Sequence, residues 1–379
     1  MKKLVWIAAL FFFGMASAGA ESLEGALEET LEGLPLDFWQ ASYENAFPAG
    51  ESFREFLLRL SRGEAALDGE ALLQALGQKF LGAVSSSLGR MAGLLIPAVF
   101  FGVLDRLRGS FSHEALGEVL HSGCFLLLAV LLAGDLQMYM ALAGENITRM
   151  ADLMQGLFPL LLTLLAAVGA TAGAAFFQQA IVAACGTMTA LVRSWTLPLA
   201  LAGGLTTLLD RLSPRMHVKR LSLLFQSAAK WLLGVGFTVF LSVTALQALG
   251  TAAVDGVSLR TAKYAVDHFV PVVGGMFADT MDTLVGASLL IKNSLGITGL
   301  LLLMVTAAGP LLQTLAAALL YRCAAALLEP VAQPRFSGCM QDFSGVLMLL
   351  FVIQLTVGAM FLLLVAQMLV VGNLTVMLR

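Results

Sequence analysis

The feature that most constrains this chain is a series of apolar segments, each long enough to cross a lipid bilayer. About 20 apolar residues in a helix span the hydrocarbon core. The segments lie at residues 83–104, 123–143, 157–175, 176–201, 223–249, 269–291, 295–320 and 346–371. Only 12% of all residues are charged, against about 25% in soluble domains. Because backbone polar groups must be satisfied internally in lipid, the pattern predicts an all-α, polytopic helical membrane protein.

The first twenty residues have the pattern of a secretory signal peptide. Lys2 and Lys3 precede a short apolar run, and small residues with A-x-A spacing follow up to Ala20. The apolar run is too short to span a bilayer, so we expect cleavage after Ala18 or Ala20, with an uncleaved anchor as the alternative. In both cases residue 21 begins outside the cytoplasm.

Residues 21–85 differ sharply from the rest, with twelve acidic residues and four basic ones. Apolar residues recur there at helical spacing, in the stripes Leu23, Leu27, Leu31, Leu34, then Phe53, Phe56, Leu57, Leu60, then Leu72, Leu76, Phe80. This predicts a small extracytoplasmic region of amphipathic helices, followed by a multi-pass transmembrane domain over 86–375. The region either caps the membrane domain or serves as a docking surface for a partner.

An internal repeat organises the membrane domain. Pro159 and Pro198 are 39 residues apart, as are Pro271 and Pro310, and a shift of 112 residues superimposes the pairs. We therefore predict tandem units at about 121–220 and 233–332. Each would contain a spanning helix, a proline-initiated re-entrant element and a second spanning helix. The re-entrant elements would be 157–175 and 269–291.

Six full crossings plus two re-entrant elements agree with the positive-inside rule, because Arg and Lys cluster at 211–220. Residues 21–85, 144–156 and 250–267 would then lie outside, and 105–122, 202–222 and 321–345 inside. Eight full crossings are the alternative, since 157–175 is long enough to span.

The stretch 264–300 is the least typical of a plain spanning helix. Pro271 lacks a backbone donor, and Gly274 and Gly275 loosen a helix, so these residues and Pro159 are the candidate helix breaks. The stretch is either a broken helix lining a polar cavity or an amphipathic connector at the membrane interface.

The same stretch carries ionisable residues at apparent membrane depth. Asp279 and Asp282 would share a helix face, and Lys292 and Asn293 follow. Each charge costs on the order of 3 kcal/mol at a helix centre, so it should face protein or water. These four residues are the candidate pore or polar cavity. A watery vestibule for the carboxylates and a snorkelling role for Lys292 remain alternatives.

Motifs for other functions are lacking. The sequence contains no Walker motif, GxSxG, HExxH or calcium-binding loop, and its four cysteines have no CxxC spacing. No basic tract suited to nucleic acid appears. We therefore expect no enzymatic activity, no catalytic residues, no cofactor, no metal and no nucleic-acid partner. The expected surroundings of the protein are the lipid bilayer.

Five short motifs in the stretch carry a resemblance to a known family. They are Pro271-Val-Val-Gly-Gly, Asp279-Thr-Met-Asp-Thr, Gly286-Ala-Ser, Ile291-Lys-Asn and Gly296-Ile-Thr-Gly. In these motifs the chain resembles the stage III sporulation protein AE family of endospore-forming bacteria, over roughly residues 85–375.

The resemblance implies a multi-pass protein of the mother-cell membrane around the forespore. It implies a subunit of the channel-like secretion apparatus between the two cells, needed for late forespore development. Other stage III sporulation A-type membrane proteins, ring-forming channel subunits and a secretion-type ATPase are the implied partners. A permease-like pore component, a non-conducting scaffold of that complex and an independent small-solute or ion transporter remain alternative functions.

The topology can be tested with reporters. Because one full crossing, at residues 176–201, separates residue 144 from residue 215, fusions at Gly144 and Arg215 should report opposite sides of the membrane. Reporters on the same side would contradict the two-crossing unit.

Overall fold

The computed structural model describes residues 25–28, 30–31, 33–34, 36–47, 52–64, 69–107, 114–168, 171–212, 218–269, 273–330 and 334–377. The described elements are all helices: α2 (Asp37–Ala46), α3 (Phe53–Ser61), α4 (Gly69–Leu107), α5 (Glu114–Ala167), α6 (Thr171–Leu191), the π-helical turn η2 (Val192–Thr196), α7 (Leu197–Leu212), α8 (Lys219–Phe269), α9 (Val273–Leu328) and α10 (Pro334–Met377). The predicted all-α, polytopic class is confirmed. The predicted signal peptide lies outside the described residues.

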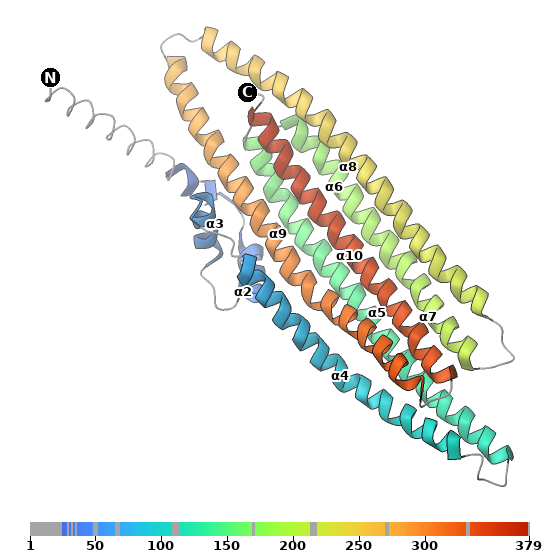
Figure 1. The fold of residues 1–379 in the computed structure, drawn as a ribbon. Helices are drawn as coiled ribbons and strands as arrows, with labels where there is room; N and C mark the ends of the chain where they lie inside the picture. The colour runs from blue at the N-terminus through green and yellow to red at the C-terminus, as the bar shows by residue number, and fades with distance from the viewer. Residues whose placement is uncertain are drawn as a thin grey trace.

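The helices are unusually long for a membrane protein. α5 has 54 residues and α9 has 56, which at about 1.5 Å per residue gives each a length of roughly 80 Å. The hydrocarbon core is only about 30 Å thick, so each helix extends well beyond it. Within the described residues, five helices contain stretches apolar and long enough to cross a bilayer. Figure 1 shows the α8–α9 hairpin reaching past the ends of its neighbours.

α10 lies at the centre of the bundle. It packs along α9, with which it forms an antiparallel hairpin, and also contacts α5, α7 and α8. α4 lies against α9 on one side of the bundle, and α6 and α8 lie on the other (Figure 1). The core is built from Leu, Ile, Val, Phe and Ala residues of α5, α9 and α10.

The N-terminal helices pack on the bundle. α3 begins with a capping box, in which Ser52 and Glu55 exchange backbone and side-chain hydrogen bonds, and this arrangement defines the helix start. Trp39 and Phe53 are each 1% exposed, with ring centroids 6.4 Å apart. Both α2 and α3 contact α9. Leu27, Leu31, Phe53 and Leu57 from the predicted apolar stripes are buried in the shared core, while α4 runs without a break through residue 85.

The structure corrects the predicted helix break at Pro159 and the re-entrant element at 157–175. α5 continues through Pro159 to Ala167, and α6 begins at Thr171. An interior proline removes one backbone hydrogen bond, whereas unwinding in apolar surroundings would leave several groups unpaired. The Thr163 hydroxyl also donates to the Pro159 carbonyl at 2.8 Å. The continuous helix is therefore the better solution.

The second expected break is only partly reproduced. α8 ends at Phe269 and α9 begins at Val273, so Pro271 falls between two helices, just outside the described residues. Gly274 and Gly275 lie in the first turn of α9, which does not break after them. The expected re-entrant element at 269–291 is instead mostly the start of a 56-residue helix. The helix ends therefore do not follow the predicted 112-residue repeat.

Two glycines let neighbouring helices approach α9 closely. Leu369 of α10 packs onto Gly296, and Leu157 of α5 packs onto Gly299. A Cβ at residue 299 would lie 2.6 Å from Leu157 Cδ2. Leu157 is fully buried and has little space into which to move. The Gly296-Ile-Thr-Gly299 motif is thus the packing surface that holds α9 between α5 and α10.

Gly299→Ala should reduce the stability of the purified protein. Forcing a methyl group against Leu157 costs about 1–3 kcal/mol in a well-packed core, which would appear as a lower thermal unfolding temperature in detergent. Gly309→Ala is the matched control, because nothing lies within 4 Å of that position in the same helix. Equal unfolding temperatures for the two variants would contradict this packing account.

Candidate functional site

Lys292 is the predicted site residue that the structure places most clearly. It lies in α9, is 1% exposed, and ranks among the largest fully buried side chains of the described residues. Its Nζ donates to the Leu369 carbonyl at 3.0 Å and to Asn373 Oδ1 at 3.4 Å, both in α10. The side chain therefore points into the α9–α10 interface.

A second polar level lies about two helical turns further along α9. Ser294 and Thr298 are buried, and the Thr298 hydroxyl donates to the Ser294 carbonyl at 2.7 Å. Gln367 of α10 donates from Nε2 to Thr244 Oγ1 of α8 at 3.4 Å, while its Oε1 is buried without a hydrogen-bond partner in the described structure. Asn293 Oδ1 is likewise buried and unpaired.

A third level joins α5, α9 and α10 near the middle of the bundle. Asn146 Nδ2 donates to Gln354 Oε1 at 2.9 Å, and Gln354 Nε2 donates to Thr314 Oγ1 at 3.1 Å. Thr314 in turn donates to the Pro310 carbonyl at 2.9 Å. Asn146, Gln354 and Thr314 are all at most 1% exposed. Asn146 Oδ1 has no partner among the described residues.

A fourth level lies toward the end of the bundle where α4 joins it. The Tyr321 hydroxyl of α9 donates to Asp135 Oδ2 of α5 in a short hydrogen bond. The Tyr321 ring meets Phe343 of α10 edge-on, with centroids 4.7 Å apart. Arg90 of α4 lies over the Tyr139 ring of α5, 5.4 Å from its centroid.

Together these residues form a polar track along the buried face of α9. We use that name for Lys292 and Asn373, Thr298 and Gln367, Asn146, Thr314 and Gln354, and Asp135 and Tyr321. Leaving a buried acceptor unpaired costs about 1–3 kcal/mol, yet the track contains two such amide oxygens, on Asn146 and Gln367, and Asn293 next to Lys292 carries another. Chemically, the track offers carbonyl and hydroxyl oxygens and one buried amine to small polar or ionic species.

The other predicted site residues are placed less completely. Asp279 and Asp282 lie in the first turns of α9, but their side chains are outside what the structure describes. The separation of about 15 Å along α9 between Asp282 and Lys292 follows from ten residues of helix.

Asn146, Thr314 and Gln354 are absent from the sequence prediction. The sequence did contain a signal, because Gln354 is one of only two amide side chains in the apolar segment 346–371. Such residues inside spanning helices hydrogen-bond across helix interfaces. The hydrogen bond between Asn146 and Gln354 could not be predicted from the sequence, since the two residues are 208 positions apart.

An apolar bundle of helices with a buried polar track defines this chain as a polytopic membrane protein. Residues 51–372 match the family described as stage III sporulation protein AE. The chain is also 30% identical over 367 residues to "Stage III sporulation protein AE" of Bacillus subtilis (strain 168), which covers 95% of this chain and 92% of that protein. The chain therefore belongs to the stage III sporulation protein AE family, which confirms the resemblance. No solved structure matches it.

The third level of the track should show strong energetic coupling. Gln354→Leu should lower the unfolding temperature in detergent, because it leaves the Asn146 amide without its partner at a cost of about 1–3 kcal/mol. Adding Asn146→Leu should recover part of that loss, since no unpaired amide then remains. Additive effects in the double-mutant cycle would show that the two amides do not interact.

Proposed function

We propose that this chain acts in sporulation as a membrane subunit of the channel-like secretion apparatus between mother cell and forespore, located in the mother-cell membrane around the forespore. Within that apparatus it serves as a permease-like pore component. The polar track along α9 is the part of the protein that contacts the permeating species. The observation that carries this proposal is the fully buried Lys292 and the polar levels that follow it through an otherwise apolar core.

The energetics favour a functional track. Replacing buried polar pairs by well-packed apolar residues is often neutral or stabilising, so a passive bundle gains little from keeping them. Ionisable residues inside membrane domains usually face cavities and mark ion or substrate pathways. Lys292 satisfies only two hydrogen bonds in the described structure, while an ammonium group has three donors. A polar species in the track would supply the remaining acceptor.

The family also supports the assembly part of the proposal. The printed name of the Bacillus subtilis relative assigns that protein to stage III of sporulation. The partners we propose for this chain are other stage III sporulation A-type membrane proteins, ring-forming channel subunits and a secretion-type ATPase. A docking face is available: α2 and α3 use their apolar sides on the bundle, which leaves Glu44 and Glu55 exposed, and Glu28, which precedes α2, is exposed as well.

That exposed acidic face favours a second candidate function, a non-conducting scaffold. In this alternative the N-terminal helices hold partners together, and the polar track only fixes the register of α5, α9 and α10. An independent transporter of small solutes or ions would use the track without the partners.

Lys292→Met separates these functions. Methionine keeps the length and apolar stem of the lysine but removes the charge and the donors to α10. If the track serves the pore, forespore-specific late gene expression should be lost while the protein level and co-purification with partners stay normal. Lys230→Met, on the exposed face of α8, is the control and should sporulate normally.

Two other results would change the conclusion. Normal sporulation with Lys292→Met would favour the scaffold. Loss of the protein from the membrane would show that Lys292 is needed for folding. Asp282→Asn would then test the pore function at a residue closer to the N-terminus of α9.

A further inference from the structure

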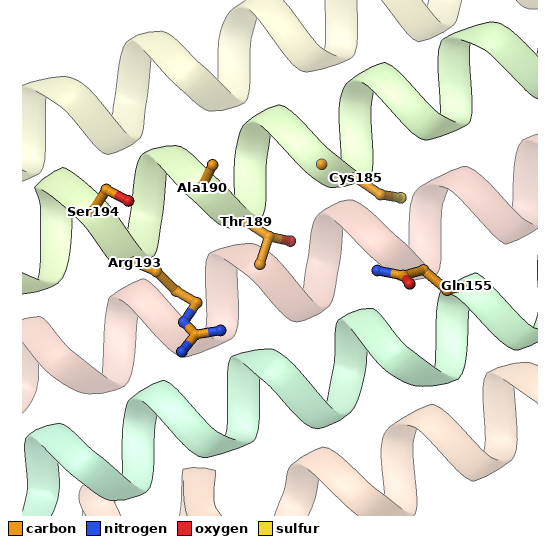
Figure 2. Close-up of a pocket in the computed structure, with 7 residues that line it drawn as sticks. Gln155, Cys185, Thr189, Ala190, Arg193 and Ser194 are labelled. Atoms are coloured by element: carbon orange, nitrogen blue, oxygen red, sulfur yellow. The ribbon is translucent and has the colours of Figure 1, made fainter.

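We propose that a pocket between α5 and α6, separate from the polar track, binds a phosphate-class anion: a phospholipid headgroup or free inorganic phosphate. The pocket has a volume of about 500 Å³ and is lined by Gln155, Cys185, Gly186, Thr189, Ala190, Arg193 and Ser194. Figure 2 shows Arg193 and Thr189 projecting from their helix toward the gap and Gln155 lying across it on α5. This site does not depend on the proposed pore function.

Arg193 gives the pocket its charge. It is the only charged residue between Asp152 and Asp210, a stretch that is otherwise apolar or neutral. A lone arginine in such a stretch costs on the order of 3 kcal/mol at bilayer depth unless it is paired or reaches polar surroundings. Arg193 is exposed toward the pocket, and no carboxylate forms an ion pair with it among the described residues. An anion in the pocket would supply that partner.

The local backbone is unusual at this point. Arg193 and Ser194 belong to the π-helical turn η2, in which the Leu197 amide bonds to the Val192 carbonyl and so widens the helix by one residue. π-bulges are rare and occur frequently at functional sites. Cys185, Thr189 and Arg193 follow one another at four-residue spacing on the helix and all line the pocket. The π-helical turn lies at the end of this row, where Arg193 is located.

The remaining polar groups can all donate hydrogen bonds. Thr189 lines the pocket, and its Oγ1 is buried without a hydrogen-bond partner in the described structure. Ser194 and Gln155 add a hydroxyl and an amide. No carboxylate lines the pocket, and the preceding acidic residue of α5, Asp152, lies outside it. A guanidinium with two hydroxyls and an amide suits a ligand that has several anionic oxygens, such as phosphate.

The position of the pocket is compatible with a lipid source. Trp195, next to the pocket, is 65% exposed, and exposed tryptophans are enriched where membrane proteins meet the headgroup layer. A headgroup would place its phosphate at Arg193 and its acyl chains along the apolar surfaces beside it. Free phosphate would use the same donors without the chains.

The experiment compares both sources on the purified full-length protein. Native mass spectrometry in detergent with added phosphatidylglycerol or phosphatidylcholine measures lipid retention, and thermal stabilisation by inorganic phosphate measures free-anion binding. Arg193→Gln should weaken binding about tenfold or more for whichever probe the wild-type protein binds, lipid or inorganic phosphate, because a charge-assisted bidentate contact is lost. Thr189→Val should weaken it several-fold without reducing stability, since it removes a hydroxyl that is unpaired in the described structure.

Arg149→Gln is the matched control. Arg149 lies on α5 outside the pocket, is exposed, and pairs with Glu145 at 3.3 Å, so the substitution makes the same charge change without affecting the site. Arg193-dependent retention of phosphatidylglycerol would identify the lipid source, and Arg193-dependent stabilisation by phosphate alone would identify the free anion. The proposal is overturned if neither probe distinguishes wild type from Arg193→Gln and Thr189→Val, or if Arg149→Gln has the same effect as Arg193→Gln.

Discussion

The close packing of α9 between α5 and α10 is the interaction on which the rest of this structure depends. Gly296 and Gly299 leave no side chain at two neighbouring turns, and Leu369 and Leu157 occupy the space from opposite partners. Dispersion contacts are short-ranged, so helices without strong hydrophobic driving force in lipid gain most where their backbones approach closely. This contact sets the distance between the three helices, and thereby the distance across which their polar side chains can bond.

The polar levels follow from that spacing. α9 and α10 are antiparallel, so Lys292 meets Asn373 near one end while Tyr321 meets Phe343 near the other. Between them, Gln354 bridges Asn146 and Thr314. A shift of one helical turn in any of these helices would leave several amides without partners in an apolar core. The polar side chains thus make the register of the bundle specific, in addition to any role in transport.

The long helices α5 and α9 continue through their prolines because an apolar core offers few other hydrogen-bond partners for unwound backbone. Pro159 and Pro310 both sit inside long helices, and in both cases the threonine four residues later donates to the proline carbonyl. Losing one bond at a proline is less costly than exposing a full turn of backbone to apolar surroundings. The stretch from Lys292 to Gly299 can be understood in these terms: Lys292 bonds to α10, while Gly296 and Gly299 allow the neighbouring helices to approach.

The sequence by itself determined the helical membrane class and the family, because these depend on local properties: apolar length and short motifs. Two of the three apolar stripes that it identified in the N-terminal region contribute buried residues, namely Leu27, Leu31, Phe53 and Leu57, since helical periodicity is local. Three results were decided only by the tertiary structure. The first is the continuity of α5 through Pro159, where the apolar surroundings override the proline's local preference. The second is the bonding of Asn146 to Gln354 across 208 residues, and the third is the placement of Thr189 and Arg193 around one pocket with Gln155. Such pairings depend on which helices are neighbours and in what register, and periodicity along one segment does not contain that information.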